Sequence, residues 1–327
     1  MPPPSPGPAV RCEAPATCRS RSPAAPSSDQ PLPVSAGQRL PGTPEPDHRW
    51  DGHGDVIVAG DSFGEPGNRP VLLQHGAGQT RHAWKGTGQA LASVGYHVIA
   101  IDLRGHGDTS WAADKDYVYE AYIADARAVI EAEFDEPPVL VGASMGGIVS
   151  LIATGERHLD TAGLVLVDIA HRSSRRGGAR VGSFMQSKRQ SGFASLEEAS
   201  EAISAYQPHR KRPRSLDGLA KNLRLGSDGR YHWHWDPDYR AGRDGDPKEK
   251  YARMIRVSES LDHVPVLLVR GGSSDVLPEF AAHEFCELAP HAEYVDIAGA
   301  DHMIAGDQND TFADAIVDFL IRRIPSI

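Results

Sequence analysis

A serine lies within the glycine-rich stretch 142–147, between an apolar run at 139–141 and a second apolar stretch at 148–153. The first run predicts a strand and the second a helix, and G-x-S-x-G between a strand and a helix is typical of a nucleophile elbow. Glycine at 142 and 146 leaves room for a turn so sharp that the serine takes a strained backbone conformation. The sequence therefore predicts that Ser144 is a nucleophile exposed at the carboxyl end of a sheet.

A carboxylate and a histidine that could activate this serine follow later in the chain. Asp275 comes after an expected strand at 265–272, and His302 comes after an expected strand at 292–297. The histidine would accept the serine proton, and the carboxylate would hold the imidazole tautomer. Asp168, which ends an expected strand at 163–168, is a second candidate for the acid. Asp301 is disfavoured because adjacent side chains on an extended loop diverge.

A third motif, His75-Gly76-Ala77-Gly78, follows an expected strand at 70–74 and precedes a helical stretch at 81–94. Glycine in such a loop lets the backbone approach a substrate closely. We expect the backbone N–H groups of Ala77 and Met145 to form an oxyanion hole, and Gly76 to contact the substrate.

These motifs, together with residues 102–110 and 269–275, occur in an order that resembles one known family. From about residue 48 to residue 324 the chain resembles α/β-hydrolase-fold enzymes, in detail the bacterial branch of serine hydrolases and cofactor-free non-haem peroxidases. The resemblance implies an α/β fold with a mostly parallel central sheet, helices on both faces, an inserted helical lid and no cofactor. It also implies that residues 102–110 are structural. The alternation of strands and helices by itself favours a parallel sheet.

Composition divides the chain into three parts. Thirteen of the 25 prolines fall in residues 1–47, which predicts a disordered tail. Residues 48–170 and 259–327 are expected to form the core, and 171–258 to form the lid. Trp233 and Trp235 lie in the lid, either packing it onto the core or lining an acyl pocket. His232 and His234 lie two residues apart, but without a third ligand they do not predict a metal site.

The remaining composition sets expectations about partners. A net charge of −10 disfavours binding to nucleic acid, and no apolar stretch approaches the length of a membrane span. Three cysteines cannot form a disulfide framework, which favours a cytoplasmic protein. The sequence leaves open whether the protein forms a homodimer. Ten Lys or Arg residues between 172 and 214 predict either a solvated face or attraction of an anionic substrate such as a carboxylate or acyl-CoA.

These features together predict a serine hydrolase that acts on a carboxylic ester or a related acyl bond, a lactone or thioester, of a small molecule with an apolar acyl group. Epoxide hydrolases and haloalkane dehalogenases need a carboxylate where this chain has Ser144. Perhydrolases and haloperoxidases typically have proline in the loop that contains Ala77, which weakens that interpretation. A C–C bond hydrolase and a non-catalytic receptor for a small ligand also stay open.

Overall fold

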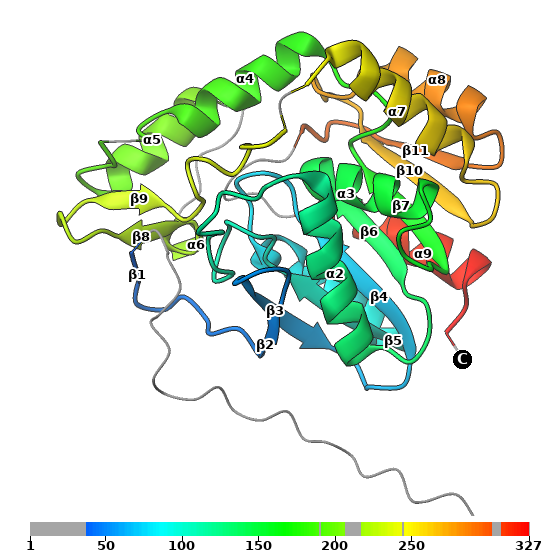
Figure 1. The fold of residues 1–327 in the computed structure, drawn as a ribbon, viewed down its shortest axis with the longest axis horizontal. Coiled ribbons are helices and arrows are strands. Elements are labelled where there is room, and N and C mark those ends of the chain that lie inside the picture. The colour runs from blue at the N-terminus through cyan, green and yellow to red at the C-terminus, as the bar shows by residue number, and fades with distance from the viewer. Residues whose placement is uncertain (1–36, 190, 207–216, 244, 303–308, 327) are drawn as a thin grey trace, which may run out of the picture. The chain divides into compact units, whose positions relative to one another are not determined.

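A computed structural model of the chain describes residues 37–189, 191–206, 217–243, 245–302 and 309–326. The disorder expected for residues 1–36 falls outside these ranges. A central sheet contains eight strands in the order β11-β10-β7-β6-β4-β5-β3-β2 (Figure 1). The six from β11 to β5 run parallel, and β3 and β2 continue the sheet in antiparallel pairing. Their bounds are β2 His48–Asp51, β3 Ile57–Phe63, β4 Arg69–Gln74, β5 Tyr96–Ile101, β6 Val139–Ala143, β7 Gly163–Val167, β10 Val266–Gly271 and β11 Glu293–Ile297.

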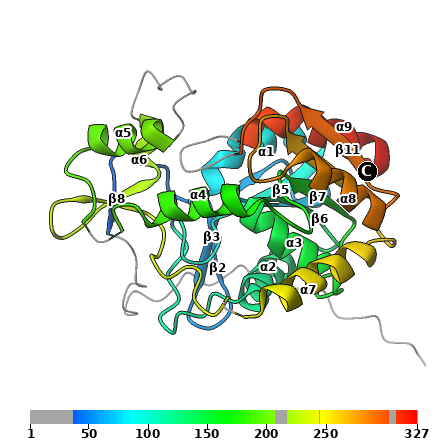
Figure 2. The same ribbon diagram turned by 90° about the horizontal axis from the view of Figure 1, so that it is seen from above.

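Helices cover both faces of this sheet, which explains why its central strands are apolar throughout rather than alternating. Every residue of β6 and β7 is buried. Leu72 of β4 faces a core shared with α2 (Tyr119–Glu133), α3 (Ser144–Gly155) and α8 (Glu279–Leu288). Its neighbours Val71 and Leu73 face a second core with α1 (Lys85–Ser93) and α9 (Ala313–Arg323), on the opposite side in Figure 2. The expected mostly parallel sheet with helices on both faces is confirmed.

The chain between β7 and β10 forms the expected insertion, but its last helix belongs to the core. The segment contains α4 (Arg175–Gln186), α5 (Leu196–Tyr206), α6 (Asp217–Ala220), β8 (Leu223–Leu225), β9 (Tyr231–Trp233) and α7 (Pro247–Glu259). Helix α7 lies directly on α3: a Cβ built on Gly155 would lie 2.3 Å from the backbone oxygen of Val257. The last helix of the expected lid therefore packs on α3 of the central domain, and the part of the insertion that precedes this helix ends at residue 246.

The end of the predicted tail also needs correction. Residues 38 and 39 form β1 (Gln38–Arg39), which pairs antiparallel with β8 and extends a small sheet in the order β1-β8-β9. Leu40 is only 8% exposed and belongs to the main core. The described residues 37–47 are thus part of the fold, because strand pairing and one buried leucine fix a segment that composition alone made look disordered.

Buried ion pairs join the insertion to the core through residues 102–110. Arg81 lies 2.6 Å from Asp102 and 2.8 Å from Asp108, and Arg224 of β8 lies 3.0 Å from Asp108. Burial alone would raise the pKa of Asp102, but Arg81, the two neighbouring histidines His75 and His82, and the hydrogen bond from the Asp108 N–H together hold that pKa well below its usual range. Charges removed from water are tolerated only when paired in this way. The structural role expected for this loop agrees with these contacts.

None of the helices in the described ranges has the length and apolar character that a membrane span requires.

Candidate active site

The turn between β6 and α3 has the geometry of a nucleophile elbow. Ser144 has a φ of +46°, a left-handed conformation that residues with a Cβ rarely adopt. A Cβ on Gly142 would lie 2.4 Å from the backbone oxygen of Gly146, and a Cβ on Gly146 would lie 2.4 Å from that of Gln74. Because real side chains do not approach so closely, both motif positions require glycine. Within the described part of the chain the Ser144 hydroxyl forms no hydrogen bond.

His302 is paired with Asp168. Its Nδ1 lies 2.6 Å from Asp168 Oδ2, and both side chains are almost fully buried. Asp168 Oδ2 also accepts from the Ser274 hydroxyl at 2.7 Å, and Oδ1 accepts from the backbone N–H of Gly271 at 3.0 Å. Asp168 directly follows β7, the neighbour of the strand that leads into Ser144. A carboxylate held in this way fixes the orientation of the imidazole through its Nδ1.

The expected partner of His302, Asp275, is engaged elsewhere. Its carboxylate accepts two hydrogen bonds from Arg180 of α4, at 2.8 and 2.9 Å, and both side chains are about 40% exposed. Asp275 follows β10, one strand farther from β6 than β7 is. The loop that contains it turns toward α4, where the Ser174 N–H donates to Val276 O at 2.8 Å. Asp275 as the acid is therefore wrong in this geometry, and the second candidate, Asp168, occupies the position.

The loop after β4 lies beside the elbow, as expected. The N–H of Gly146 donates to His75 O at 3.1 Å, and a Cβ on Gly76 would lie 3.2 Å from the Ser144 Cβ. Among the described residues, the N–H groups of Ala77 and Met145 have no backbone acceptor outside regular secondary structure. Met145 lies in the first turn of α3, where N–H groups have no partner within the helix. Both N–H groups therefore remain available to a developing oxyanion.

Two side chains whose roles the sequence did not predict hold this loop. Gln79 Oε1 accepts from the Gly76 N–H at 2.9 Å, and Gln79 Nε2 donates to Asn309 Oδ1 at 3.0 Å. His75 Nε2 accepts from the Leu103 N–H at 3.0 Å, so Nδ1 carries the proton and donates to Gly76 O at 2.7 Å. Burial lowers the pKa of His75 and favours its neutral form. The sequence signal for these contacts is a glutamine or histidine next to a G-x-G loop, because such side chains can form hydrogen bonds with the backbone of the loop.

The two lid tryptophans differ in position. Trp235 reaches the loop after β4: a Cβ on Gly78 would lie 3.4 Å from its ring and 2.6 Å from Met185 Sδ. Trp233 stacks on Trp235 with ring centroids 4.7 Å apart and contacts Phe184 and Phe193 from inside the insertion. Trp235 and Met185 therefore lie beside the loop next to Ser144, whereas Trp233 packs the insertion.

The histidines next to these tryptophans have structural partners. His232 Nε2 lies 3.0 Å from Asp228 Oδ2, and His234 Nδ1 accepts from the Gly107 N–H at 2.7 Å. Among the described residues no group of three or more histidine, cysteine or carboxylate side chains is arranged to hold a metal ion.

Comparison with known proteins places this geometry in a family. The family model described as alpha/beta hydrolase fold matches residues 69–307. An esterase from Mycobacterium tuberculosis is 26% identical over 73% of this chain and 78% of its own. A 3-hydroxybutyrate-oligomer hydrolase from Cupriavidus necator is 26% identical over 75% of this chain and 86% of its own. The crystal structure of an alpha/beta hydrolase from Novosphingobium aromaticivorans matches the fold with a TM-score of 0.69, at 22% identity over 84% of this chain and 97% of its own.

Proposed function

The chain belongs to the α/β-hydrolase fold family and is a hydrolase, and on that premise we propose that it cleaves carboxylic esters through an acyl-enzyme on Ser144. The observation that carries this proposal is the buried 2.6 Å contact between His302 and Asp168, at the edge of the sheet where Ser144 is held in its strained turn. A serine is too weak a nucleophile near neutral pH unless a neighbouring base accepts its proton.

In this mechanism each residue has one task. His302 accepts the Ser144 proton as the hydroxyl oxygen attacks the ester carbonyl, and Asp168 offsets the positive charge that forms on the imidazole. The N–H groups of Ala77 and Met145 donate to the oxyanion, an interaction of about 3 kcal/mol for each donor. His302 then gives its proton to the leaving alcohol. Water activated by the same imidazole releases the acid and restores Ser144.

The names of the relatives support an ester bond over the other acyl bonds. One relative is named an esterase and another a hydrolase of 3-hydroxybutyrate oligomers. We further propose that residues 171–246 act as a lid that shapes the acyl site. The contacts of Met185 and Trp235 with the loop at Gly78 support this role.

Replacing the nucleophile tests the proposal. Ser144→Ala should lower kcat on p-nitrophenyl butyrate by at least about a thousandfold, because the remaining groups cannot form the acyl-enzyme. A fluorophosphonate probe should label the wild-type chain and leave Ser144→Ala unlabelled.

Ser191→Ala is the matched control, because Ser191 lies in a turn of the insertion and, among the described residues, its hydroxyl bonds only to the carbonyl of Gly192. It should keep both activity and labelling. Ester turnover that survives Ser144→Ala, or labelling at another serine, would contradict the proposal. A wild-type chain that hydrolyses no ester and reacts with no probe would instead favour a ligand receptor.

A further inference from the structure

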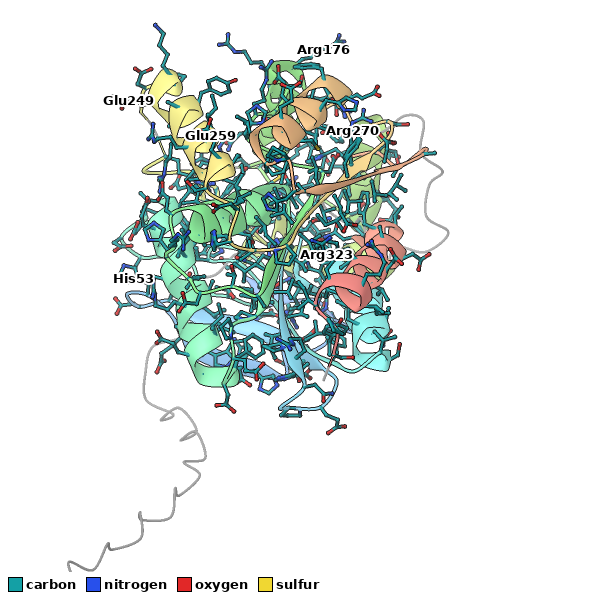
Figure 3. The ribbon with its side chains drawn as sticks, turned by 90° about the vertical axis from the view of Figure 1, so that its right-hand side faces the viewer. His53, Arg176, Glu249, Glu259, Arg270 and Arg323 are labelled. Carbon is teal, nitrogen blue, oxygen red and sulfur yellow. The ribbon has the colours of Figure 1, made fainter. Side chains whose placement is uncertain are left out.

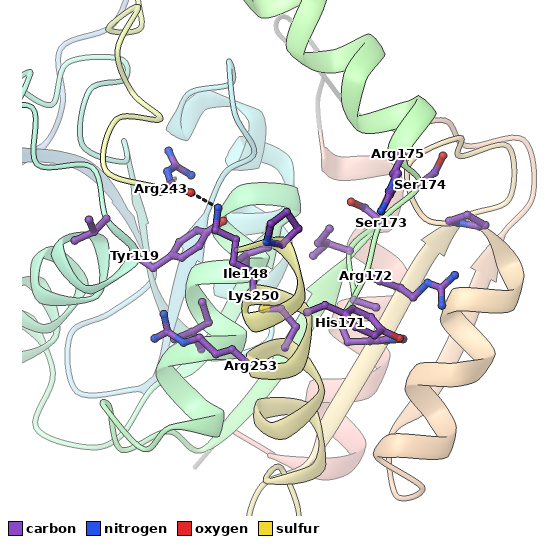
Figure 4. Close-up of a pocket in the computed structure, with 18 of the residues that line it drawn as sticks. Tyr119, Ile148, His171, Arg172, Ser173, Ser174, Arg175, Arg243, Lys250 and Arg253 are labelled. Atoms are coloured by element: carbon purple, nitrogen blue, oxygen red, sulfur yellow. Dashed lines mark hydrogen bonds between the residues drawn. The ribbon is translucent and has the colours of Figure 1, made fainter. Parts of the chain in front are cut away.

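A pocket of about 940 Å³ opens beside the nucleophile helix and has no role in the mechanism above. Its walls come from five parts of the chain: the segment 169–175 after β7, helix α3, the start of α7 with the preceding residues 242–243, residues 118–120 at the start of α2, and residues 278 and 280 at the start of α8 (Figure 4). Ser144, His302 and Asp168 are not among its lining residues, but Ile169 follows Asp168 directly.

The floor of this pocket is apolar, and its residues on α3 lie on the same face of that helix as Ser144. Ile148 and Ile152 lie four and eight residues after Ser144 on α3, and residues at this spacing share one face of a helix. At about 1.5 Å of rise per residue, the floor extends from one to two turns beyond Ser144. Ile169 also touches the elbow, because a Cβ on Gly147 would lie 2.3 Å from its Cγ2.

The rim carries exposed aromatic rings. Among the described residues only three large hydrophobic side chains are strongly exposed, and two of them, Tyr251 at 41% and Phe280 at 52%, line this pocket. The Arg172 guanidinium lies over the Phe280 ring at 4.8 Å. Exposed rings at the mouth of a hollow are typical of a binding site for an apolar group.

The polar side chains of the pocket are mainly cationic. Arg172 and Arg253 pair with carboxylates, at 3.1 Å and 2.7 Å. Arg175, Arg243 and Lys250 form no ion pair with any residue in the described ranges. Figure 4 shows them on two sides of the pocket, with Arg175 on the segment that leads into α4 and Arg243 near Lys250, which donates to its carbonyl. The one carboxylate in the lining, Glu120, already pairs with Arg253.

A buried imidazole adds an unused polar group. His171 lines the pocket with its side chain 2% exposed. Its Nε2 lies 3.5 Å from Glu284 Oε2, and its Nδ1 has no hydrogen-bond partner among the described residues. A buried polar atom without a partner costs free energy that a bound ligand can recover. Three cations without a carboxylate partner among the described residues, together with this imidazole and an apolar floor, complement an anion with an apolar body.

We propose that this pocket binds the anionic end of the substrate: a carboxylate or phosphate group held by Arg175, Arg243 and Lys250, on an apolar chain that extends along α3 toward Ser144. This substrate class rests on the proposed ester hydrolysis. The expected substrate is an ester whose acyl part carries a negative charge at the end remote from the scissile bond.

Two esters of equal length test the charge preference. They are p-nitrophenyl octanoate and the mono-p-nitrophenyl ester of the dicarboxylic acid with the same number of carbons. The wild-type kcat/KM should be higher for the anionic ester, and the ratio of the two values should fall as salt screens the cations. In Arg175→Gln/Lys250→Gln the ratio should fall about tenfold, because two partly exposed charge contacts are lost. Arg175→Lys should restore most of the effect of Arg175→Gln.

The matched control is Arg176→Gln, which removes the same charge from the next residue of α4. Arg176 is exposed, lies at the outer edge of the molecule in Figure 3 and is not part of the pocket lining. This variant should keep the wild-type ratio. A ratio near one in the wild type, or an equal fall in the control and the double variant, would overturn the proposal.

Direct binding separates this proposal from the proposed function. In full-length Ser144→Ala, calorimetry should detect octanoate or octyl phosphate binding more tightly than octanol, and the stronger of the two anions identifies the head group. Arg175→Gln/Lys250→Gln in that background should weaken the anion. Equal binding of all three compounds, or no loss in the charge variant, would overturn the pocket assignment. Failure to hydrolyse either ester, with anion binding intact, would instead overturn the proposed function and leave an anion-binding pocket.

Discussion

Two aspartates are candidates for the carboxylate that orients His302, and their contacts distinguish them. Asp168 accepts from His302, Ser274 and the Gly271 backbone within a buried site, whereas Asp275 faces Arg180 at the surface. Asp168→Asn should therefore lower kcat by about a thousandfold or more, because an amide favours the wrong tautomer of His302. Asp275→Asn should keep kcat within about threefold. Ester assays on both variants, with circular dichroism to verify folding, check the assignment.

The opposite pattern, with Asp275→Asn inactive and Asp168→Asn active, would show that the pairing in this structure is not the one used in catalysis. Equal loss in both variants would indicate that the docking of α4 through Arg180 is itself needed for activity.

Among the elements, β1 shows how a short segment contributes to stability. Two residues pair with β8, and Leu40 beside them packs into the main core. Leu40→Ala should lower the free energy of unfolding by about 2 kcal/mol, at the low end for a buried leucine because the site lies near the surface. Urea denaturation measures this change.

Gln38→Ala serves as the control for β1, because the Gln38 side chain is exposed and only its backbone takes part in the pairing. It should change the unfolding free energy by less than about 0.5 kcal/mol. A Leu40→Ala variant as stable as this control would mean that β1 does not hold residues 37–47 in place.

For the molecule as a whole, buried histidines make stability depend on pH. Burial lowers the pKa of His106 to about 3 and that of His234 well below its usual value. The unfolded chain binds these protons near pH 6.5, whereas the folded chain does not. The contribution of these two histidines to stability is therefore full above about pH 6.5 and decreases as the pH falls toward 3. Each such histidine contributes up to about 1.4 kcal/mol per pH unit in that window.

Removing one of these imidazoles should make the free energy of unfolding depend less steeply on pH. His106→Phe keeps a ring beside Tyr239 and should lower the dependence of unfolding free energy on pH by about one proton between pH 6.5 and 5. His283→Gln, at an exposed position on α8, should leave the slope unchanged. Urea titrations at several pH values provide the measurement, and an unchanged slope in His106→Phe would contradict the role of that histidine.

Much of the fold could be predicted from the sequence because its determinants are local. The apolar runs that form β4, β6, β7 and β10 are buried on both faces, so each is recognisable from its own residues. The helix predicted at 148–153 lies within α3. The short β1 was missed because its only support is pairing with β8, far along the chain.

The candidate site likewise depends partly on local sequence and partly on contacts between distant segments. The sequence by itself determined the elbow, because the glycines that Ser144 requires lie within two residues of it and clash with backbone nearby if replaced. Only the tertiary structure decided which carboxylate meets His302, since Asp168 and Asp275 both follow apolar strands and differ in the neighbours of those strands. It also decided that cations from residues 172–175 and 243–250 face one pocket. Strand order and helix packing bring distant residues together, and no local pattern encodes them.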